Sequence, residues 1–205
     1  MRPNLSLGAV VLAGGKSSRF GSDKGSALLQ GKTLLEWSVR SVTEIAEKTV
    51  IVKAPSQKIP FLHNGVKIVD DQYLNRGPLA GLITGFDSLD TELVIAIGCD
   101  TPLIVPELWS FLNDCIKDYD LVLPRINGLL QPLVAVYRRE ICKKIFIQSL
   151  ENGERKIINT FHGLKIREIE EIKIKEIDPG LVSFHNVNTR ENLIEAENIL
   201  KMGAQ

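Results

Sequence analysis

Cysteine is scarce in this chain. The 205 residues contain only Cys99, Cys115 and Cys142, an odd number without C-x-x-C spacing. Neither a disulfide framework nor a zinc ribbon is therefore predicted, and a reducing, cytoplasmic setting is the expectation. The three histidines show no ligand spacing either, which argues against a transition-metal site.

An excess of one charge and a long hydrophobic run are also missing. Lys plus Arg and Asp plus Glu both number 25, so the formal net charge is zero and a polycationic nucleic-acid binder is excluded. The apolar run from Leu7 to Ala13 falls far short of the roughly 20 residues that span a bilayer. Because no export-type segment is recognised, this run is interpreted as a buried strand. We expect neither nucleic acid nor a membrane as partner.

Three common catalytic motifs are absent. Gly15-Lys16-Ser17 would close a Walker A loop only if glycine stood five positions before Gly15, where the chain has Val10. The segment does not fit G-x-G-x-x-G, and no G-x-S-x-G occurs. P-loop ATPases, dinucleotide dehydrogenases and serine hydrolases thereby lose their main support.

Short runs rich in Val and Ile alternate with longer segments of helical period. This alternation is typical of a mostly parallel sheet covered by helices on both faces. No linker rich in Ser, Gly or Pro interrupts it, so one domain over residues 1–205 is expected. The predicted strands are Gly8 to Leu12, Thr49 to Val52, Val66 to Val69, Leu93 to Gly98, Leu121 to Leu123 and Pro132 to Tyr137.

Helices are predicted between and after these strands. The first is marked by a T-x-x-E capping box at Thr33 and Glu36, and two others begin at prolines that suit a first helical turn. The stretch from Lys165 to Asp178 mixes isoleucines with charges and is interpreted as two short edge strands with a solvated face. The predicted helices are Leu34 to Ala46, Pro78 to about Leu89, one beginning at Pro106, Arg139 to Leu150, and Asn192 to Leu200.

The segment from Leu12 to Lys24, L-A-G-G-K-S-S-R-F-G-S-D-K, directly follows the first strand. Gly14 and Gly15 leave the backbone free to turn and to present its amides to an anion, and clustered cations follow them. From residue 14 to residue 32 the four cations Lys16, Arg19, Lys24 and Lys32 face one carboxylate, Asp23, which gives a local charge of +3. These residues predict a phosphate-binding loop.

Carboxylates follow two other strands. Asp70 and Asp71 end the run V-K-I-V-D-D, and Asp100 ends L-V-I-A-I-G-C-D. Because the carboxyl ends of parallel strands share one edge of the sheet, both groups and the glycine loop are expected at one crevice. A carboxylate beside bound phosphates is the arrangement that Mg²⁺ prefers, so Asp100 is the candidate metal ligand.

An ordered set of motifs then resembles the molybdenum cofactor guanylyltransferase family. It comprises L-A-G-G-K-S-S-R-F-G-S-D-K-G, D-D-Q-Y-L-N-R-G-P-L-A-G-L, C-D-T-P, Q-P-L-V-A-V-Y, G-E-R-K and N-V-N-T, and it spans Leu12 to about Leu193. The resemblance implies a Rossmann-like three-layer α/β/α nucleotidyltransferase. It also implies an enzyme that uses GTP and Mg²⁺ to add GMP to molybdopterin, releasing pyrophosphate, with molybdoenzyme clients or maturation factors as possible partners.

The resemblance assigns roles by position. Arg19, Lys24 and Asp100 would be catalytic, with Asp100 the Mg²⁺ ligand, and Lys53 departs from the uncharged polar residue common in the family. Of the two acids before G-P-L-A-G, Asp70 has the better spacing and Asp71 stays open. The nucleotide-binding set is Leu12, Ala13, Gly14, Gly15, Lys24, Asp70, Asp71 and Asp100, and the pterin-side set is Gln131, Arg155, Asn186 and Asn188.

Three alternatives stay open at this point. Two are enzymes of the same fold, a cytidylyltransferase for the same cofactor and a sugar-phosphate nucleotidyltransferase; L-A-G-G in place of L-A-A-G favours the guanylyl enzymes. The third is a non-catalytic nucleotide-binding protein that delivers cofactor. Lys24 together with Asp100 argues against it, since a pure binder needs neither a metal ligand nor a charge-neutralising lysine.

Replacing Lys24 by alanine tests the predicted phosphate-binding loop. Lys24→Ala should abolish nucleotidyl transfer while leaving the fold intact, because the lysine is expected to neutralise charge on the phosphates. Pyrophosphate release measures the first effect and circular dichroism the second. A well-folded variant that keeps its activity would remove the assignment.

Overall fold

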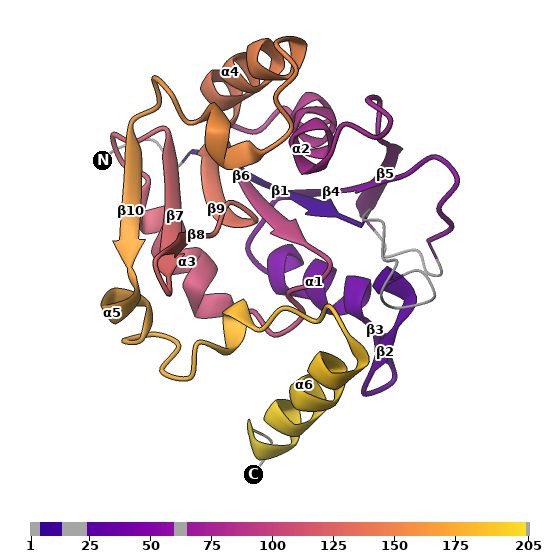
Figure 1. Cartoon of the computed structure of the whole chain (residues 1–205). Coiled ribbons are helices and arrows are strands. Elements are labelled where there is room, and N and C mark those ends of the chain that lie inside the picture. The colour runs from indigo at the N-terminus through magenta and orange to yellow at the C-terminus, as the bar shows by residue number, and fades with distance from the viewer. Residues whose placement is uncertain (1–4, 14–23, 60–64, 204–205) are drawn as a thin grey trace.

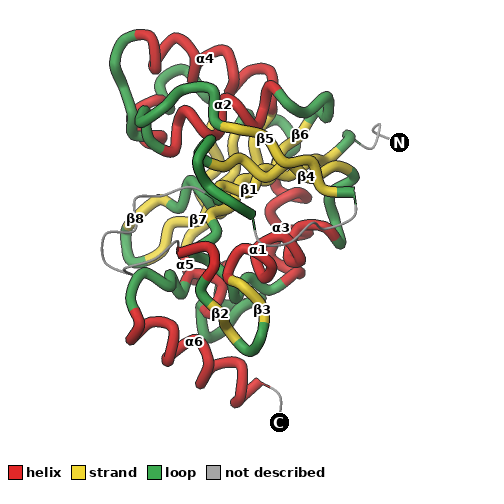
Figure 2. The backbone as a smooth tube through the Cα atoms, turned by 90° about the vertical axis from the view of Figure 1, so that its right-hand side faces the viewer, coloured by secondary structure: helices red, strands yellow, loops and turns green. Residues whose placement is uncertain are grey.

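The computed structural model describes residues 5–13, 24–59 and 65–203, and shows a sheet with helices packed on both of its faces (Figures 1 and 2). The sheet contains eight strands in the order β10-β7-β9-β6-β1-β4-β5, with β8 paired to β7. This confirms the predicted fold class. The strands are β1 Leu7–Leu12, β4 Lys48–Lys53, β5 Val66–Asp70, β6 Leu93–Gly98, β7 Leu121–Ile126, β8 Leu129–Leu130, β9 Val134–Arg138 and β10 Ile166–Glu170.

Most strand pairs are parallel. β1 pairs with β4 and β6, β4 with β5, and β7 with β10, all in parallel. β9 lies antiparallel between β6 and β7, and the short β8 forms an antiparallel hairpin with β7. The carboxyl ends of β6, β1, β4 and β5 therefore meet along one edge, as the sequence predicted.

Strand β1 lies inside the sheet and is apolar throughout. All six of its residues are buried, which suits a parallel strand covered on both faces. Alternate side chains enter two separate cores: Ala9 and Val11 pack on one face, and Val10 and Leu12 on the other.

Two helices cover each face of the sheet. α1 (Leu34–Thr43) and α3 (Pro106–Cys115) contribute to the first core, and α2 (Pro78–Asp87) and α4 (Arg139–Glu151) to the second. The second core holds the mutually packed rings of Phe86, Tyr137 and Phe146, whose centroids lie 5.6 to 5.9 Å apart. The contacts among these rings hold α2 and α4 against strand β9 of the sheet.

The predicted capping box starts α1. The Thr33 hydroxyl accepts from the Glu36 amide at 3.1 Å, and a Glu36 carboxylate oxygen accepts from the Thr33 amide at 2.6 Å. The helix ends at Thr43, earlier than the predicted Ala46. The Glu44 amide there turns back to the Val42 carbonyl, which ends the regular hydrogen-bond ladder.

The prediction of two edge strands between Lys165 and Asp178 is wrong in its second half. Ile166–Glu170 forms edge strand β10, but Glu171–Ile174 forms the short helix α5. The Glu171 carboxylate accepts from the Asn127 amide at 2.9 Å and pairs with Lys175 at 2.6 Å. These contacts favour a helical turn that buries Ile174 and leaves Ile172 exposed.

Strand β7 runs three residues beyond its predicted end at Leu123. It continues through Pro124, which has no amide to donate. β9 pairs with β7 only at Leu121 and Val122, so the missing amide falls where that pairing has ended.

A small third core lies at the carboxyl-terminal end of the chain. Helix α6 (Arg190–Gly203) packs on a two-stranded ribbon that the sequence did not predict, β2 (Leu28–Leu29) and β3 (Lys32–Thr33). Figure 1 shows α6 at the bottom of the molecule, below α1. The short 3-10 helices are η1 Lys24–Ser26, η2 Ile157–Thr160 and η3 Val182–Phe184.

Neither a membrane-crossing helix nor a disulfide is seen in the described parts of the chain. No helix within residues 5–13, 24–59 and 65–203 has the length and apolar character that crossing a bilayer requires. Cys99, Cys115 and Cys142 are buried, and none of them forms a disulfide with another described residue.

The contact between α2 and β1 depends on Gly85. A Cβ at this position would lie 2.4 Å from Cγ1 of Val10, a buried β-branched side chain with little freedom to move. Gly85→Ala should therefore lower the free energy of unfolding by about 1–3 kcal/mol through overpacking.

Gly81→Ala is the matched control on the same helix. Its Cβ would meet only the terminal methyl of Leu12, at 3.0 Å, which can rotate away. Urea denaturation of both variants measures the difference, and equal effects would contradict the proposed packing constraint.

Candidate active site

Leu12 and Ala13 are held at the carboxyl edge of the sheet by backbone hydrogen bonds. The Leu12 carbonyl accepts from the Cys99 amide at 3.1 Å, and the Ala13 amide donates to the Val52 carbonyl at 2.9 Å. The Ala13 carbonyl accepts from the side-chain amide of Gln57 at 2.9 Å. The chain therefore leaves β1 in a fixed direction, tied to both neighbouring strands.

Several predicted residues lie outside the described residues. These are Gly14, Gly15 and Arg19. Lys24 begins η1, but its side chain is outside them too. Their assignment to the nucleotide stays a prediction.

Asp100 lies just beyond the end of β6 and is partly exposed. Its Oδ1 occupies the space above Gly98, where a Cβ would be only 2.4 Å away. Glycine at position 98 thus allows the carboxylate to fold back over the end of the strand. Leu133 is the next neighbour, with Cδ1 3.6 Å from the same point.

The N-V-N-T motif contacts Asp100 through its backbone. The Val187 amide donates to the Asp100 carbonyl at 2.8 Å, and the Val187 side chain is buried in the third core. Asn186 and Asn188 flank this anchor and are exposed. The structure therefore brings both predicted asparagines next to Asp100.

Gln131 lies in the short connection between β8 and β9. Its amide donates to the Pro124 carbonyl at 3.0 Å, and its carbonyl accepts from the Val134 amide at 3.0 Å. Because β9 is antiparallel to β6, this connection enters the sheet at the edge from which Asp100 leaves. Gln131 and Leu133 thus lie on the β7 side of Asp100.

Asp70 pairs with Lys53. The two residues face each other across β4 and β5, and Lys53 Nζ lies 2.5 Å from Asp70 Oδ1. The lysine side chain is only 17% exposed, while that of Asp70 is 57% exposed. Lys53, the departure noted from the sequence, thus neutralises one of the two competing acids.

Asp71 is turned towards α2. Its Oδ1 accepts from the Thr84 hydroxyl at 3.1 Å and from the Tyr73 amide at 3.0 Å. The Thr84 hydroxyl also accepts from the Gln72 amide at 3.2 Å. Asp71 therefore stabilises the turn between β5 and α2.

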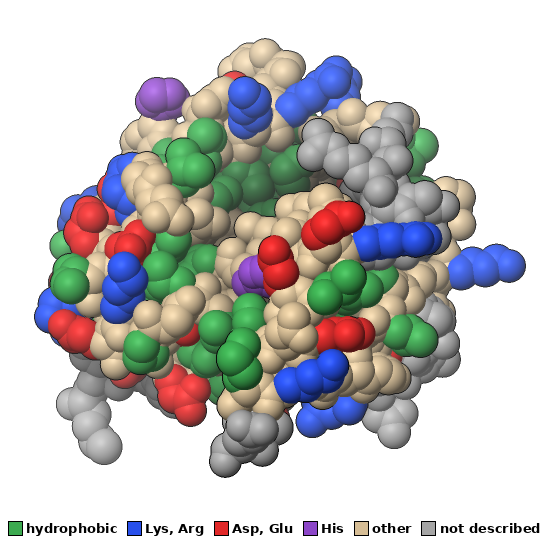
Figure 3. Space-filling view, turned by 60° about the horizontal axis from the view of Figure 1, so that its bottom comes forward, with side chains coloured by type: hydrophobic (Ala, Val, Ile, Leu, Met, Phe, Trp, Pro, Cys, Tyr) green, Lys and Arg blue, Asp and Glu red, His purple; other side chains and the backbone are tan. Residues whose placement is uncertain are grey.

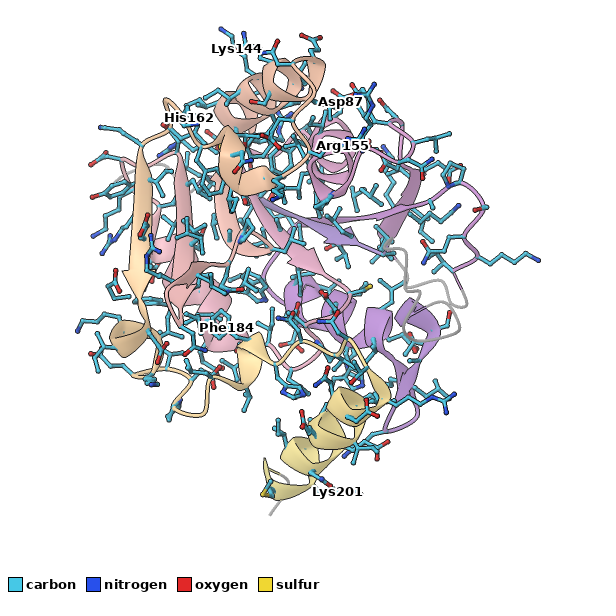
Figure 4. The ribbon with its side chains drawn as sticks, viewed as in Figure 1. Asp87, Lys144, Arg155, His162, Phe184 and Lys201 are labelled. Carbon is cyan, nitrogen blue, oxygen red and sulfur yellow. The ribbon has the colours of Figure 1, made fainter. Side chains whose placement is uncertain are left out.

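Arg155 lies on the segment between α4 and η2, beside the start of α2 (Figure 4). Its carbonyl oxygen is 3.3 Å from the point that a Cβ on Gly77 would occupy. Gly77 precedes α2 with a φ of 81°, a conformation that favours glycine. The G-P-L-A-G and G-E-R-K motifs are thus in direct contact, which their separation in the sequence did not predict.

Asp70 and Asp100 cannot share a metal ion. Asp70 is the last residue of β5, and Asp100 lies just beyond β6. Because β4 and β1 lie between these strands, three strand spacings place the two residues roughly 14 Å apart. Within the described parts of the chain, no group of three or more His, Cys, Asp or Glu residues could hold a metal. A single carboxylate nevertheless fits Mg²⁺ when substrate phosphates supply other ligands, and Asp100 meets that requirement.

The face that carries this edge is hollowed. Figure 3 shows a groove across its middle, with hydrophobic side chains on the floor and charged residues around it. The sequence analysis considered only polar residues at this edge and did not predict the apolar surface between them.

Sequence reasoning also missed Gln57 and Glu154. Gln57 follows β4 in a turn without a recognisable motif, so nothing in the sequence connects it to Ala13. Glu154 belongs to G-E-R-K, but only the structure shows that its carboxylate accepts hydrogen bonds from the two residues that follow it.

Comparisons with known proteins reveal related sequences over nearly the whole chain. A profile described as the MobA-like NTP transferase domain matches residues 9–166. A probable molybdenum cofactor guanylyltransferase from Natranaerobius thermophilus is 34% identical over 204 residues, covering 98% of each chain. A molybdenum cofactor guanylyltransferase from Desulfosudis oleivorans is 32% identical and covers 95% of this chain and 96% of its own.

Solved structures share the fold. Molybdopterin-guanine dinucleotide biosynthesis protein A from Archaeoglobus fulgidus has a TM-score of 0.81 at 24% identity, covering 95% of this chain and 99% of its own. A 4-diphosphocytidyl-2C-methyl-D-erythritol synthase from Anaerococcus prevotii has a TM-score of 0.74 at 13% identity, covering 96% of each chain. One architecture therefore occurs in proteins with different names and nucleotides.

The contacts of Asp70 and Asp71 predict different effects on stability. Asp71→Ala removes the acceptor for Thr84 and Tyr73 and should lower the free energy of unfolding by about 1–2 kcal/mol. Asp70→Ala breaks an ion pair whose carboxylate is largely exposed, and Lys53 keeps its hydrogen bonds to the Ala54 and Pro55 carbonyls, so the loss should be less than about 1 kcal/mol. Chemical denaturation measures both, and a larger loss for Asp70→Ala would contradict the roles given to these contacts.

Proposed function

The chain belongs to the MobA-like NTP transferase domain family, as its motifs predicted, and from this membership we propose that it is a molybdenum cofactor guanylyltransferase. It transfers GMP from GTP to molybdopterin and releases pyrophosphate. The full-length relatives that carry this name support the reaction. It is a nucleotidyltransferase in which residues 1–205 form one catalytic domain.

The observation that carries the proposal is the meeting of Leu12, Ala13, Asp100 and the N-V-N-T motif at one edge of the sheet. The Cys99 amide joins β6 to Leu12, and the Asp100 carbonyl joins β6 to Val187. Parts of the chain that are far apart in sequence thus meet at the ends of β1 and β6. This is the place where an open α/β sheet binds its ligand.

Asp100 would hold Mg²⁺ together with the phosphates of GTP. When bound there, the ion neutralises part of the triphosphate charge. The partly exposed carboxylate above Gly98 suits this use because its direction is set by the strand end.

The chemistry requires positioning more than covalent assistance. A terminal phosphate oxygen of molybdopterin attacks the α-phosphorus of GTP in line, and the bond from that phosphorus to the bridging oxygen of pyrophosphate breaks. The attacking phosphate is already ionised near neutral pH, so no general base is needed. Arg19, Lys24 and the amides of the loop from Leu12 to Gly15 stabilise the charge on the phosphates.

The acceptor occupies the groove between the β7 side of Asp100 and the start of α2. Its apolar floor suits a planar pterin ring, and Gln131, Asn186 and Asn188 supply hydrogen-bonding groups nearby. Arg155 supplies a cation beside the start of α2, whose first turn has no side-chain cap. Molybdoenzymes or their maturation factors would receive the product in the cytoplasm.

Of the two acids after β5, Asp70 is the one proposed to meet the nucleotide. Its Oδ2 makes no hydrogen bond with another described residue. By contrast, Oδ1 of Asp71 already accepts hydrogen bonds from the Tyr73 amide and the Thr84 hydroxyl. A carboxylate there could accept from the ring N–H and amino group of guanine, which cytosine cannot match in the same arrangement.

Pyrophosphate release with GTP and with CTP tests the proposal, with molybdopterin present in both reactions. GTP should be turned over at least about 100-fold faster in kcat/KM, because the two hydrogen bonds that guanine would donate to Asp70 have no equivalent arrangement in cytosine. Asp100→Asn should reduce the GTP reaction by about 100-fold or more, because it loses the metal-binding charge.

Three results would contradict the proposal. A preference for CTP would favour the cytidylyl alternative, and turnover with a sugar phosphate in place of molybdopterin would favour the sugar-phosphate alternative. Tight GTP binding independent of Mg²⁺ and without turnover would favour a delivery protein. Unfolding curves that match the wild-type curve should accompany the Asp100→Asn measurement.

A further inference from the structure

We propose that Glu154 is a positioning residue that holds Arg155 against the start of α2, and thereby sets the affinity for the acceptor substrate. This inference rests on the proposed function and extends it to a residue for which neither the motif resemblance nor the family gave a role. Its basis is a set of contacts that converge on one carboxylate.

Glu154 accepts three hydrogen bonds. Its Oε1 accepts from the backbone amides of Arg155 at 2.7 Å and Lys156 at 2.8 Å. Its Oε2 accepts from the side-chain amide of Asn159 at 2.9 Å. One side chain thus satisfies the amides at the start of a turn that leads into η2, as an N-cap residue does.

The surrounding backbone leaves this turn few alternatives. α4 ends at Glu151, Gly153 follows with a φ of 87°, and the Glu154 amide donates back to the Ser149 carbonyl at 3.0 Å. Ile157 is buried immediately afterwards. The turn is therefore anchored at both ends, and the carboxylate determines the path between them.

That path places Arg155 against Gly77. The Arg155 carbonyl lies 3.3 Å and its Cβ 3.7 Å from the position of a Cβ on Gly77. Any side chain at position 77 would push this contact apart. The close approach means that a small displacement of the turn also moves the Arg155 side chain relative to α2.

The side chain of Arg155 is available to a ligand. It is exposed, and within residues 5–13, 24–59 and 65–203 its guanidinium makes neither a hydrogen bond nor an ion pair. Within Arg155, only the backbone amide forms a hydrogen bond with Glu154. The carboxylate therefore orients the residue while leaving the cation free for an anionic substrate.

The ionised state of Glu154 fits this role. Its hydrogen bond from the Lys156 amide, followed by those from Asn159 and the Arg155 amide, holds its pKa below the ordinary value. A lowered pKa keeps the carboxylate charged, and able to accept all three bonds, throughout the neutral range.

A double-mutant cycle at positions 154 and 155 tests the inference through steady-state kinetics with GTP and molybdopterin. Glu154→Ala should raise the KM for molybdopterin by about tenfold and leave kcat and the KM for GTP within about twofold. In the Arg155→Ala background, the same change should add less than about twofold, because Glu154 acts through Arg155.

Glu154→Gln keeps one oxygen acceptor, so its effect on the KM for molybdopterin should be smaller, at about threefold. If Glu154→Ala does not fold, Glu154→Gln can be combined with Arg155→Ala in a second double-mutant cycle. Glu151→Ala is the matched control, because Glu151 lies three residues earlier, is exposed, and has no hydrogen bond or ion pair with another described residue. Glu151→Ala should leave kcat, the KM for GTP and the KM for molybdopterin unchanged.

Two outcomes would overturn the inference while leaving the proposed function in place. One is an equal rise in the KM for molybdopterin from Glu154→Ala in both backgrounds. The other is a rise in the KM for GTP as large as that for molybdopterin. A wild-type protein that does not transfer GMP would instead overturn the proposed function, and this inference with it.

Discussion

The in-register parallel pairing of β1 with its two neighbours is the constraint on which the site depends. Leu12 stands opposite Val52 on β4 and Gly98 on β6, so all three strands end at the same level. The backbone then continues this alignment, with the Leu12 carbonyl bound to Cys99 and the Ala13 amide bound to Val52. Since β1 is buried on both faces, a shift by one residue would reverse the packing of its whole length.

This constraint explains why much of the fold could be predicted. Buried parallel strands are continuous apolar runs, and their ends are marked by glycine and aspartate, as in I-A-I-G-C-D before Thr101. The capping box at Thr33 is equally local and is confirmed. By contrast, α5 depends on Glu171 binding the Asn127 amide, a contact across 44 residues that no local pattern contains.

The candidate site likewise has features that the sequence predicts and features that depend on tertiary contacts. The shared carboxyl edge that carries Leu12 and Asp100 followed from the alternation of elements, whereas the order of the strands came from the structure. The difference between Asp70 and Asp71 did not, because two adjacent acids look alike in sequence but point to opposite faces of a strand. One meets Lys53 and the other Thr84, and both partners come from elements whose positions are set by tertiary packing.

The antiparallel strand β9 affects how substrate preference could change during evolution. It separates β6, β1, β4 and β5, which end at the proposed nucleotide site, from β7 and β10, so the edge of the sheet has two halves. The β8–β9 connection, with Gln131 and Leu133, enters between them. Insertions in that connection would reshape the proposed acceptor site near Gln131 without disturbing the register of β1. Under the proposed function, acceptor preference could therefore change while the proposed nucleotide site stays the same.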